Sequence, residues 1–241
     1  IGEPLVDVKF SGLSWKGNEG IFYSSYEKPK GSELSAKTDQ HRLFFHKLGT
    51  KQAEDAILFG DQEKRRYVGG YVSDDNRYLF ISAANSTSGN ELYLKYLSVP
   101  NSPIVAIHKG FEYDVDVLDN ICTTLFIVTN LKAPNKRIVT VDVANPGVEN
   151  CKDLIPETEQ VLNPSTGAGY IFANYMKDAV SVVKQFDYKG KLIRTIALPG
   201  VGTASGFGGK AKDKELYFSF TNYVTPGTTY TFFPDSGKSS V

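Results

Sequence analysis

The stretch Ser73-Asp74-Asp75-Asn76-Arg77-Tyr78-Leu79-Phe80-Ile81 joins four turn-forming residues to a short apolar element. The same kind of apolar tripeptide recurs at Ile21-Phe22-Tyr23, Leu125-Phe126-Ile127, Ile171-Phe172-Ala173 and Leu216-Tyr217-Phe218. The five central aromatic residues lie 58, 46, 46 and 45 residues apart. The longer first interval contains a polar excursion from Lys28 to Gln40, which a surface loop tolerates. A repeat at this interval is typical of β-propeller blades.

Each tripeptide lies between further turn and strand signals. Gly, Asn and Asp precede the copies and supply the positive φ angles that tight hairpins need. A second extended run follows each copy, at 41–48, 91–97, 136–143, 181–188 and 228–233. A short closing strand completes the unit, as at 104–107 and 192–196. The pattern predicts an all-β chain of about five four-stranded antiparallel blades, at about 10–59, 65–109, 111–157, 161–199 and 200–241.

Two other architectures fit the pattern less well. A helical solenoid is excluded because these windows lack 3.6-residue spacing and contain many Gly and Pro residues. A β-sandwich with evenly spaced strands does not require one tripeptide at a fixed interval. If the blade register is right, the tripeptides lie in equivalent strands. Each central aromatic (Phe22, Phe80, Phe126, Phe172 and Tyr217) then packs between adjacent sheets.

The composition describes a neutral chain with enough apolar residues for a core. Of the 241 residues, 41% are apolar and 12% aromatic, and 27 basic residues balance 27 acidic ones. Nucleic acid and acidic membrane partners are not expected, because such partners need a basic excess or stripe. We expect no transmembrane helix, since no 18-residue apolar window occurs. The start, Ile1-Gly2-Glu3-Pro4, has no signal-peptide features, and we expect a piece of a longer protein.

The two cysteines, Cys122 and Cys151, are not expected to form a disulfide bond. The predicted strands put Cys122 near the start of a second strand and Cys151 on the fourth, about 9 to 10 Å apart. A disulfide needs Cα atoms within about 7 Å. Two cysteines also leave the compartment open between the cytoplasm and the bacterial periplasm.

Searches for a nucleophile and a proton relay give no candidate. The hydrolase elbow Gly-x-Ser-x-Gly has no match, and the segment Gly12 to Gly17 misses it by one residue. His41 and His46 lie five residues apart on one predicted strand, and therefore on opposite faces. We interpret these two residues and His108 as surface or edge residues. No catalytic residue is assigned.

The sequence also does not match the phosphate-loop and calcium-loop motifs. The glycine cluster from Gly200 to Lys210 lacks the first glycine of a phosphate loop, at Ala204, and its Ser or Thr, at Ala211. We expect its glycines to let a strand approach its neighbours closely. The acidic run of Glu112, Asp114, Asp116 and Asp119 lacks the Gly and terminal Glu of a calcium loop, so we interpret it as solvated carboxylates. No cofactor and no metal are expected.

Four collinear stretches together resemble the propeller domain of the prolyl oligopeptidase family. They are His46 to Asp55, Val68 to Tyr78, Ser205 to Gly209, and Glu215 to Tyr223 followed by Pro226, Gly227 and Tyr230. The resemblance covers essentially the whole chain. It implies a seven-bladed propeller on an α/β-hydrolase domain that carries a Ser-Asp-His triad and cleaves short peptides after proline. The chain then corresponds to blades three to seven, without the catalytic domain.

The same resemblance implies three substrate-pocket wall positions. Val68 matches a Met of the family, Thr87 a Cys, and Ala84 an Arg that can meet acidic substrate groups. These departures imply a smaller and less polarised outer subsite. For Val68, packing between blades is an equal alternative to substrate contact.

Two functions are compatible with the sequence. The chain is the non-catalytic lid and size filter of a prolyl peptidase, with the α/β-hydrolase domain and short proline-containing peptides as partners. Alternatively, it is a stand-alone propeller that serves as a protein-interaction scaffold. The flanking reading frame distinguishes them, because only the first function requires a downstream Gly-x-Ser-x-Gly followed by Asp and His.

Overall fold

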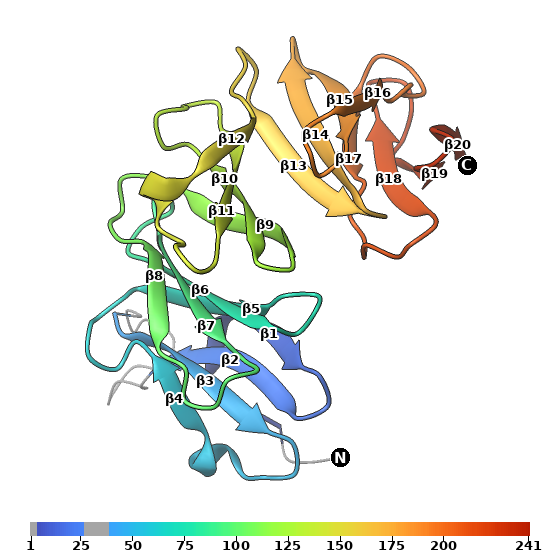
Figure 1. Ribbon diagram of the computed structural model, residues 1–241. Helices are drawn as coiled ribbons and strands as arrows, with labels where there is room; N and C mark the ends of the chain where they lie inside the picture. Colours follow the sequence, from blue (N-terminus) through green and yellow to red (C-terminus); the bar gives the residue numbers. More distant parts are fainter. Residues whose placement is uncertain (1–3, 27–38) are drawn as a thin grey trace. The chain divides into compact units, whose positions relative to one another are not determined.

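Figure 1 shows a computed structural model of the chain, which describes residues 4–26 and 39–241. The described residues form five four-stranded antiparallel sheets and two 3-10 turns, Gln52–Glu54 and Val148–Asn150. Every sheet is a simple meander in which each strand pairs with its neighbour in the sequence. The predicted all-β architecture of five four-stranded sheets is therefore confirmed. Most of the predicted loop from Lys28 to Gln40 lies outside the described residues.

The strands follow one another in five groups of four. The first sheet contains β1 (Val8–Lys16), β2 (Gly20–Tyr26), β3 (His41–Lys47) and β4 (Ala56–Phe59), and the second contains β5 (Tyr67–Val72), β6 (Tyr78–Ala84), β7 (Glu91–Tyr96) and β8 (Ile104–His108). The third contains β9 (Val115–Ile121), β10 (Thr124–Thr129), β11 (Arg137–Asp142) and β12 (Lys152–Ile155). The fourth contains β13 (Leu162–Gly167), β14 (Tyr170–Lys177), β15 (Val180–Phe186) and β16 (Leu192–Thr195). The fifth contains β17 (Thr203–Gly206), β18 (Leu216–Thr221), β19 (Thr228–Phe233) and β20 (Lys238–Ser240).

The chain divides into two compact units. Unit 1 comprises residues 1–116 and 145–150, and unit 2 comprises residues 117–144 and 151–241. Each unit has its own apolar core between neighbouring sheets. In unit 1 the core joins the first two sheets, and in unit 2 two clusters join the third sheet to the fourth and the fourth to the fifth.

The five tripeptides occupy the second strand of each sheet, as predicted. Their side chains alternate between the two faces of the sheet, because successive residues of a strand point in opposite directions. In β14, Ile171 and Ala173 pack against the third sheet, whereas Phe172 packs against the fifth. Phe22 likewise faces the second sheet. In these two repeats, the central aromatic residue therefore faces the next sheet.

The predicted burial of the central aromatic residue is confirmed at four positions and wrong at Tyr217. Phe22, Phe80, Phe126 and Phe172 are at most 3% exposed, but Tyr217 is 54% exposed. Leu216 and Phe218 face the fourth sheet and are buried. The alternation turns Tyr217 to the opposite face, which no sheet covers among the described residues. Its hydroxyl donates a hydrogen bond to Glu215 instead, at 2.9 Å.

The glycine cluster before β18 allows the close approach that the sequence predicted. The backbone N–H of Gly209 donates to the carbonyl of Thr166 in β13 at 3.0 Å, and a Cβ on Gly209 would lie 2.5 Å from the Leu216 side chain. Beside it, Phe207 has a φ of 63° and stacks on Phe218 with ring centroids 4.6 Å apart. The buried Phe207 ring offsets the strain of this left-handed conformation.

At four places, a polar residue at or just before the third strand of one sheet forms a hydrogen bond with the first strand of the next sheet. His41 Nδ1 accepts a hydrogen bond from the Val68 N–H at 2.9 Å, and Ser181 Oγ accepts one from the Ala204 N–H at 3.0 Å. The Asn135 carbonyl accepts one from the N–H of Leu162 at 2.8 Å. Within unit 1, the Asn90 side chain accepts the Val115 N–H and donates to the Val115 carbonyl, at 3.0 and 2.9 Å. We call these four contacts the strand latches.

His41 is wholly buried, so the interpretation of this residue as a surface or edge residue is wrong. Its Nε2 donates to the carbonyl of Lys9 at 2.9 Å, while Nδ1 accepts the N–H of Val68. These two partners require a neutral ring, and burial lowers the pKa of His41 below its usual value. His108 is also buried, which lowers its pKa, but it lies on the outer strand β8 and is therefore an edge residue, as expected. His46 lies half-buried and bonds to Asp55 at 2.8 Å.

The two cysteines form no disulfide bond, as predicted, but each lies just outside the strand in which it was expected. Cys122 and Cys151 are not joined by a disulfide bond. Cys122 lies in the turn between β9 and β10, and Cys151 directly precedes β12, so each is placed just outside its expected strand. We expect two thiols to react with Ellman's reagent when the protein is unfolded without reductant. A reading of zero thiols would contradict this placement.

The latch at Ser181 gives a test of the contribution of one strand latch. Ser181→Ala leaves the buried Ala204 N–H without its acceptor, and we expect unfolding of unit 2 to become easier by about 1–2 kcal/mol. Ser219→Ala, at an exposed position of β18, is the matched control and should change stability by less than about 0.5 kcal/mol. Urea unfolding at neutral pH measures both. Equal stability of the two variants would show that the latch contributes nothing.

Burial of His41 predicts a loss of stability in weak acid. Because the folded-state pKa is lowered, the unfolded chain binds more protons below about pH 6.5. Stability is therefore full above pH 6.5 and falls as the pH drops toward the lowered pKa. Urea unfolding between pH 7.5 and 5.5, with NMR titration of the histidine rings, measures this. His41→Gln should flatten part of the pH dependence, and an unchanged slope would contradict the assignment.

Candidate functional site

The three predicted wall residues lie at one end of the second sheet, where β5 begins and β6 ends. Val68 pairs with Ala83, and the neighbouring Tyr67 pairs with Ala84. Thr87 lies in the bend that follows β6 and is exposed. The structure therefore brings the three positions to the same edge of the sheet.

One of the three residues is buried, and the other two have solvent-exposed side-chain surface. Val68 is only 2% exposed and belongs to the core between the first two sheets, where its N–H is held by His41. Ala84 is half-buried and Thr87 is exposed. Only Ala84 and Thr87 can therefore offer side-chain surface to a ligand, whereas Val68 supports the strand behind them.

Arg66 is a polar neighbour of Ala84 that sequence reasoning missed. Its backbone N–H donates to the side chain of Asn85 at 3.2 Å, and its exposed guanidinium lies 5.5 Å from the ring centroid of Tyr67. Tyr67 in turn meets Phe10 edge-on at 5.8 Å. The residue opposite Ala84 is therefore flanked by a cation, although Ala84 itself is small. No spacing in the sequence indicates this, because the proximity comes from the β5–β6 register.

An ion-pair network stiffens the same end of the sheet. Arg65 Nε donates to Glu91 at 2.6 Å and a second nitrogen donates to Glu63 at 2.5 Å, while the guanidinium lies 5.3 Å from the centroid of Phe111. The Glu91 bond raises the pKa of Arg65 above its already high value. Burial, with Glu91 close by, raises the pKa of Tyr93 to about 12. Both groups therefore keep their protons at neutral pH.

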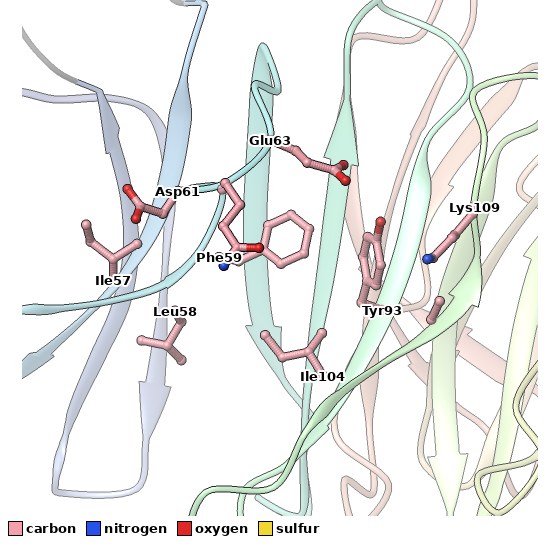
Figure 2. A pocket seen from close by; sticks show the side chains of 11 residues that line it. Ile57, Leu58, Phe59, Asp61, Glu63, Tyr93, Ile104 and Lys109 are labelled. Atoms are coloured by element: carbon pink, nitrogen blue, oxygen red, sulfur yellow. The ribbon is translucent and has the colours of Figure 1, made fainter.

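A pocket of about 550 Å³ lies beside this network, between the outer strands of the first two sheets (Figure 2). Its apolar wall comes from Leu58 and Phe59 of β4 and from Ile104 of β8. The rings of Phe59 and Tyr93 lie 4.8 Å apart between centroids. Figure 2 shows the side chains of Glu63 and Lys109 directed toward Tyr93 at one side of the pocket. No motif in the sequence predicted this pocket, because two sheets form it together.

Two of the four acidic residues that the sequence singled out accept hydrogen bonds from neighbouring parts of the chain. Asp119 accepts a hydrogen bond from the hydroxyl of Tyr188, and Asp114 accepts one from the N–H of Gly89 at 2.8 Å. In the part of the chain that the structure describes, no three His, Cys, Asp or Glu side chains converge on a metal position. Neither of the two short helical turns in the described residues has the length or apolarity to cross a membrane.

Comparison with known proteins identifies the fold and the family. The profile of the prolyl oligopeptidase N-terminal β-propeller domain matches residues 1–241. The chain belongs to the prolyl oligopeptidase family. The five meanders are therefore propeller blades, as the repeat predicted.

Two relatives and one solved structure place the domain within longer proteins. The chain is 55% identical over 243 residues to a prolyl endopeptidase of Elizabethkingia miricola, covering all of this chain and 34% of that protein. It is 28% identical to a prolyl endopeptidase of Dictyostelium discoideum, covering 92% and 33%. A solved structure from a study of two prolyl endopeptidases matches 98% of this chain and 34% of its own, at 30% identity and a TM-score of 0.86. The propeller domain thus spans about a third of the relatives it matches.

The ion-pair network at this end of the propeller domain can be tested by removing one partner. Glu91→Gln leaves the half-buried Arg65 without its main counter-ion, and we expect a loss of about 3 kcal/mol in the stability of unit 1. Glu19→Gln breaks the exposed pair with Lys16 and should cost less than about 1 kcal/mol. Urea unfolding compares the two variants, and similar small losses would show that the network is not structurally important.

Proposed function

We propose that the chain is the non-catalytic lid and size filter of a prolyl oligopeptidase-like serine peptidase that cleaves short peptides after proline. The observation that carries this proposal is the match of all 241 residues to the N-terminal propeller domain of that family. In this function an α/β-hydrolase domain of the same protein holds the nucleophile, the base and the orienting acid. The propeller restricts which peptides reach them.

Within this function, Ala84 and Thr87 form part of the substrate-pocket wall and Val68 positions the strand behind them. The argument rests on exposure, because Ala84 and Thr87 have side-chain surface while Val68 is buried in the core. The small Ala84 side chain carries no charge, so the proposed outer subsite is less polarised at this position, as the family resemblance implies.

The proposed blade boundaries are 10–59, 65–109, 111–157, 161–199 and 200–241, as blades three to seven of a closed propeller. The face of the first sheet supports the presence of a further sheet in the whole protein. On that face Leu13, Trp15 and Ile57 are 63%, 58% and 43% exposed. Register places Leu13 opposite Tyr23 and Trp15 opposite Ile21, on the face away from the second sheet. An apolar face of this kind is typical of a buried interface.

The proposed division of labour is tested by activity. The 241-residue chain alone should not hydrolyse a proline-containing chromogenic peptide, whereas the full-length protein should, in a reaction that a serine-directed phosphonate abolishes. Turnover by the chain alone that the phosphonate blocks would refute the lid function. An inactive full-length protein without a hydrolase domain would support the alternative, a stand-alone interaction scaffold.

The wall assignment is tested at Ala84 in the full-length protein. Ala84→Arg should raise kcat/KM about fivefold for a peptide with an acidic residue near the proline, by adding one exposed ion pair. Turnover of the matching neutral peptide should change little. Thr221→Arg, on an exposed position of β18, is the control and should alter neither. Equal effects on acidic and neutral peptides would contradict a wall position for Ala84.

A further inference from the structure

The pocket between β4 and β8 combines an apolar wall with one lysine, Lys109. Leu58, Phe59 and Ile104 provide the wall, and Ala106 lies beside Ile104 on the same lining. The volume of about 550 Å³ falls within the range of roughly 300–1,000 Å³ that small-ligand pockets occupy. It is therefore large enough for a ligand rather than a few water molecules.

Among the charged residues that line the pocket, Lys109 is the one that favours an anionic group on the ligand. Asp61 lies 3.4 Å from Arg42, and Glu63 lies 2.5 Å from Arg65, which also pairs with Glu91. Lys109 is exposed and makes no ion pair with any residue in the described ranges 4–26 and 39–241. Its side chain is directed toward Tyr93 in Figure 2. A carboxylate on the ligand would supply the counter-ion that Lys109 lacks.

The strands that border the pocket favour an extended peptide. Within residues 4–26 and 39–241, β4 pairs only with β3 and β8 only with β7, so each is the outer strand of its sheet. An outer strand carries backbone N–H and C=O groups on one side that a further extended chain can pair with. Alternate side chains of such a peptide would point into the apolar wall while its backbone followed the strand.

We propose that this pocket binds the carboxyl-terminal end of an apolar peptide, with the α-carboxylate on Lys109 and an aliphatic side chain against Leu58, Phe59 and Ile104. The site uses residues of unit 1 alone. It does not depend on the proposed peptidase function, because its contacts involve neither a catalytic domain nor proline. The apolar wall supplies affinity, and Lys109 selects a free carboxyl terminus over an amide.

The binding experiment uses the 241-residue chain and the peptide Gly-Ser-Leu-Val with fluorescein on its amino terminus. Fluorescence anisotropy should give a Kd on the order of 10–100 µM for the free carboxylate, a range typical of small interfaces. The carboxamide form of the same peptide should bind about fivefold more weakly, the effect of losing one partly exposed ion pair. Equal affinity of the two forms, or the absence of binding at about 1 mM, would overturn the proposal.

Variants of the chain separate the charge from the apolar wall. Lys109→Met should reduce affinity about fivefold for the carboxylate and leave the carboxamide unchanged, while Lys109→Arg should bind like the unmodified chain. Lys177→Met, which removes an exposed lysine from β14, is the matched control and should have no effect. Ala106→Met should fill the pocket and weaken both forms at least about tenfold, with thermal melting of each variant as the check on folding. Unchanged binding by Lys109→Met would refute the role of Lys109, whatever the result at Ala106.

Discussion

The strand latches are the constraint on which the rest of the structure depends. A propeller blade buries both faces against its neighbours, and apolar faces alone allow two sheets to slide past each other. The latches remove this freedom because each one joins a fixed backbone position in one sheet to a fixed position in the first strand that follows. At Ser181 and Ala204 the bonded groups are buried, so a displaced register would leave polar groups unpaired in the core. The alternating aromatic and aliphatic side chains of neighbouring sheets then pack against each other in a single register.

The strand latches also position the residues of the candidate site. The latch from His41 ends at Val68, which pairs with Ala83, while its neighbour Tyr67 pairs with Ala84. Arg65, whose carbonyl accepts the N–H of His41, also pairs with Glu91. The edge that offers Ala84 and Thr87 is therefore held by buried hydrogen bonds and one ion-pair network. The proposed wall is thereby fixed in one shape, which the proposed filter function requires.

The sequence predicted the repeat because each blade needs the same burial pattern at the same place. It did not predict the latches, since their residue types differ from one blade to the next. The side chains of a histidine, an asparagine and a serine, and the backbone carbonyl of Asn135, fill one structural role. The wrong interpretation of His41 has the same origin, because no local pattern marks a histidine that is buried between two sheets.

Tyr217 fits the repeat in sequence, and its exposure depends on whether another sheet covers that face. The proposed wall positions could be inferred only through family resemblance, and the pocket beside Lys109 forms only when two sheets come together.

Amide hydrogen exchange measured by NMR tests the latches most directly. The N–H groups of Val68, Leu162 and Ala204 each donate to a latch residue, so they open only when neighbouring sheets separate. The account predicts that these amides exchange as slowly as those at the centre of β6 and β14. Exchange of the three latch amides at rates close to those of exposed loops, while the central strands stay protected, would contradict it.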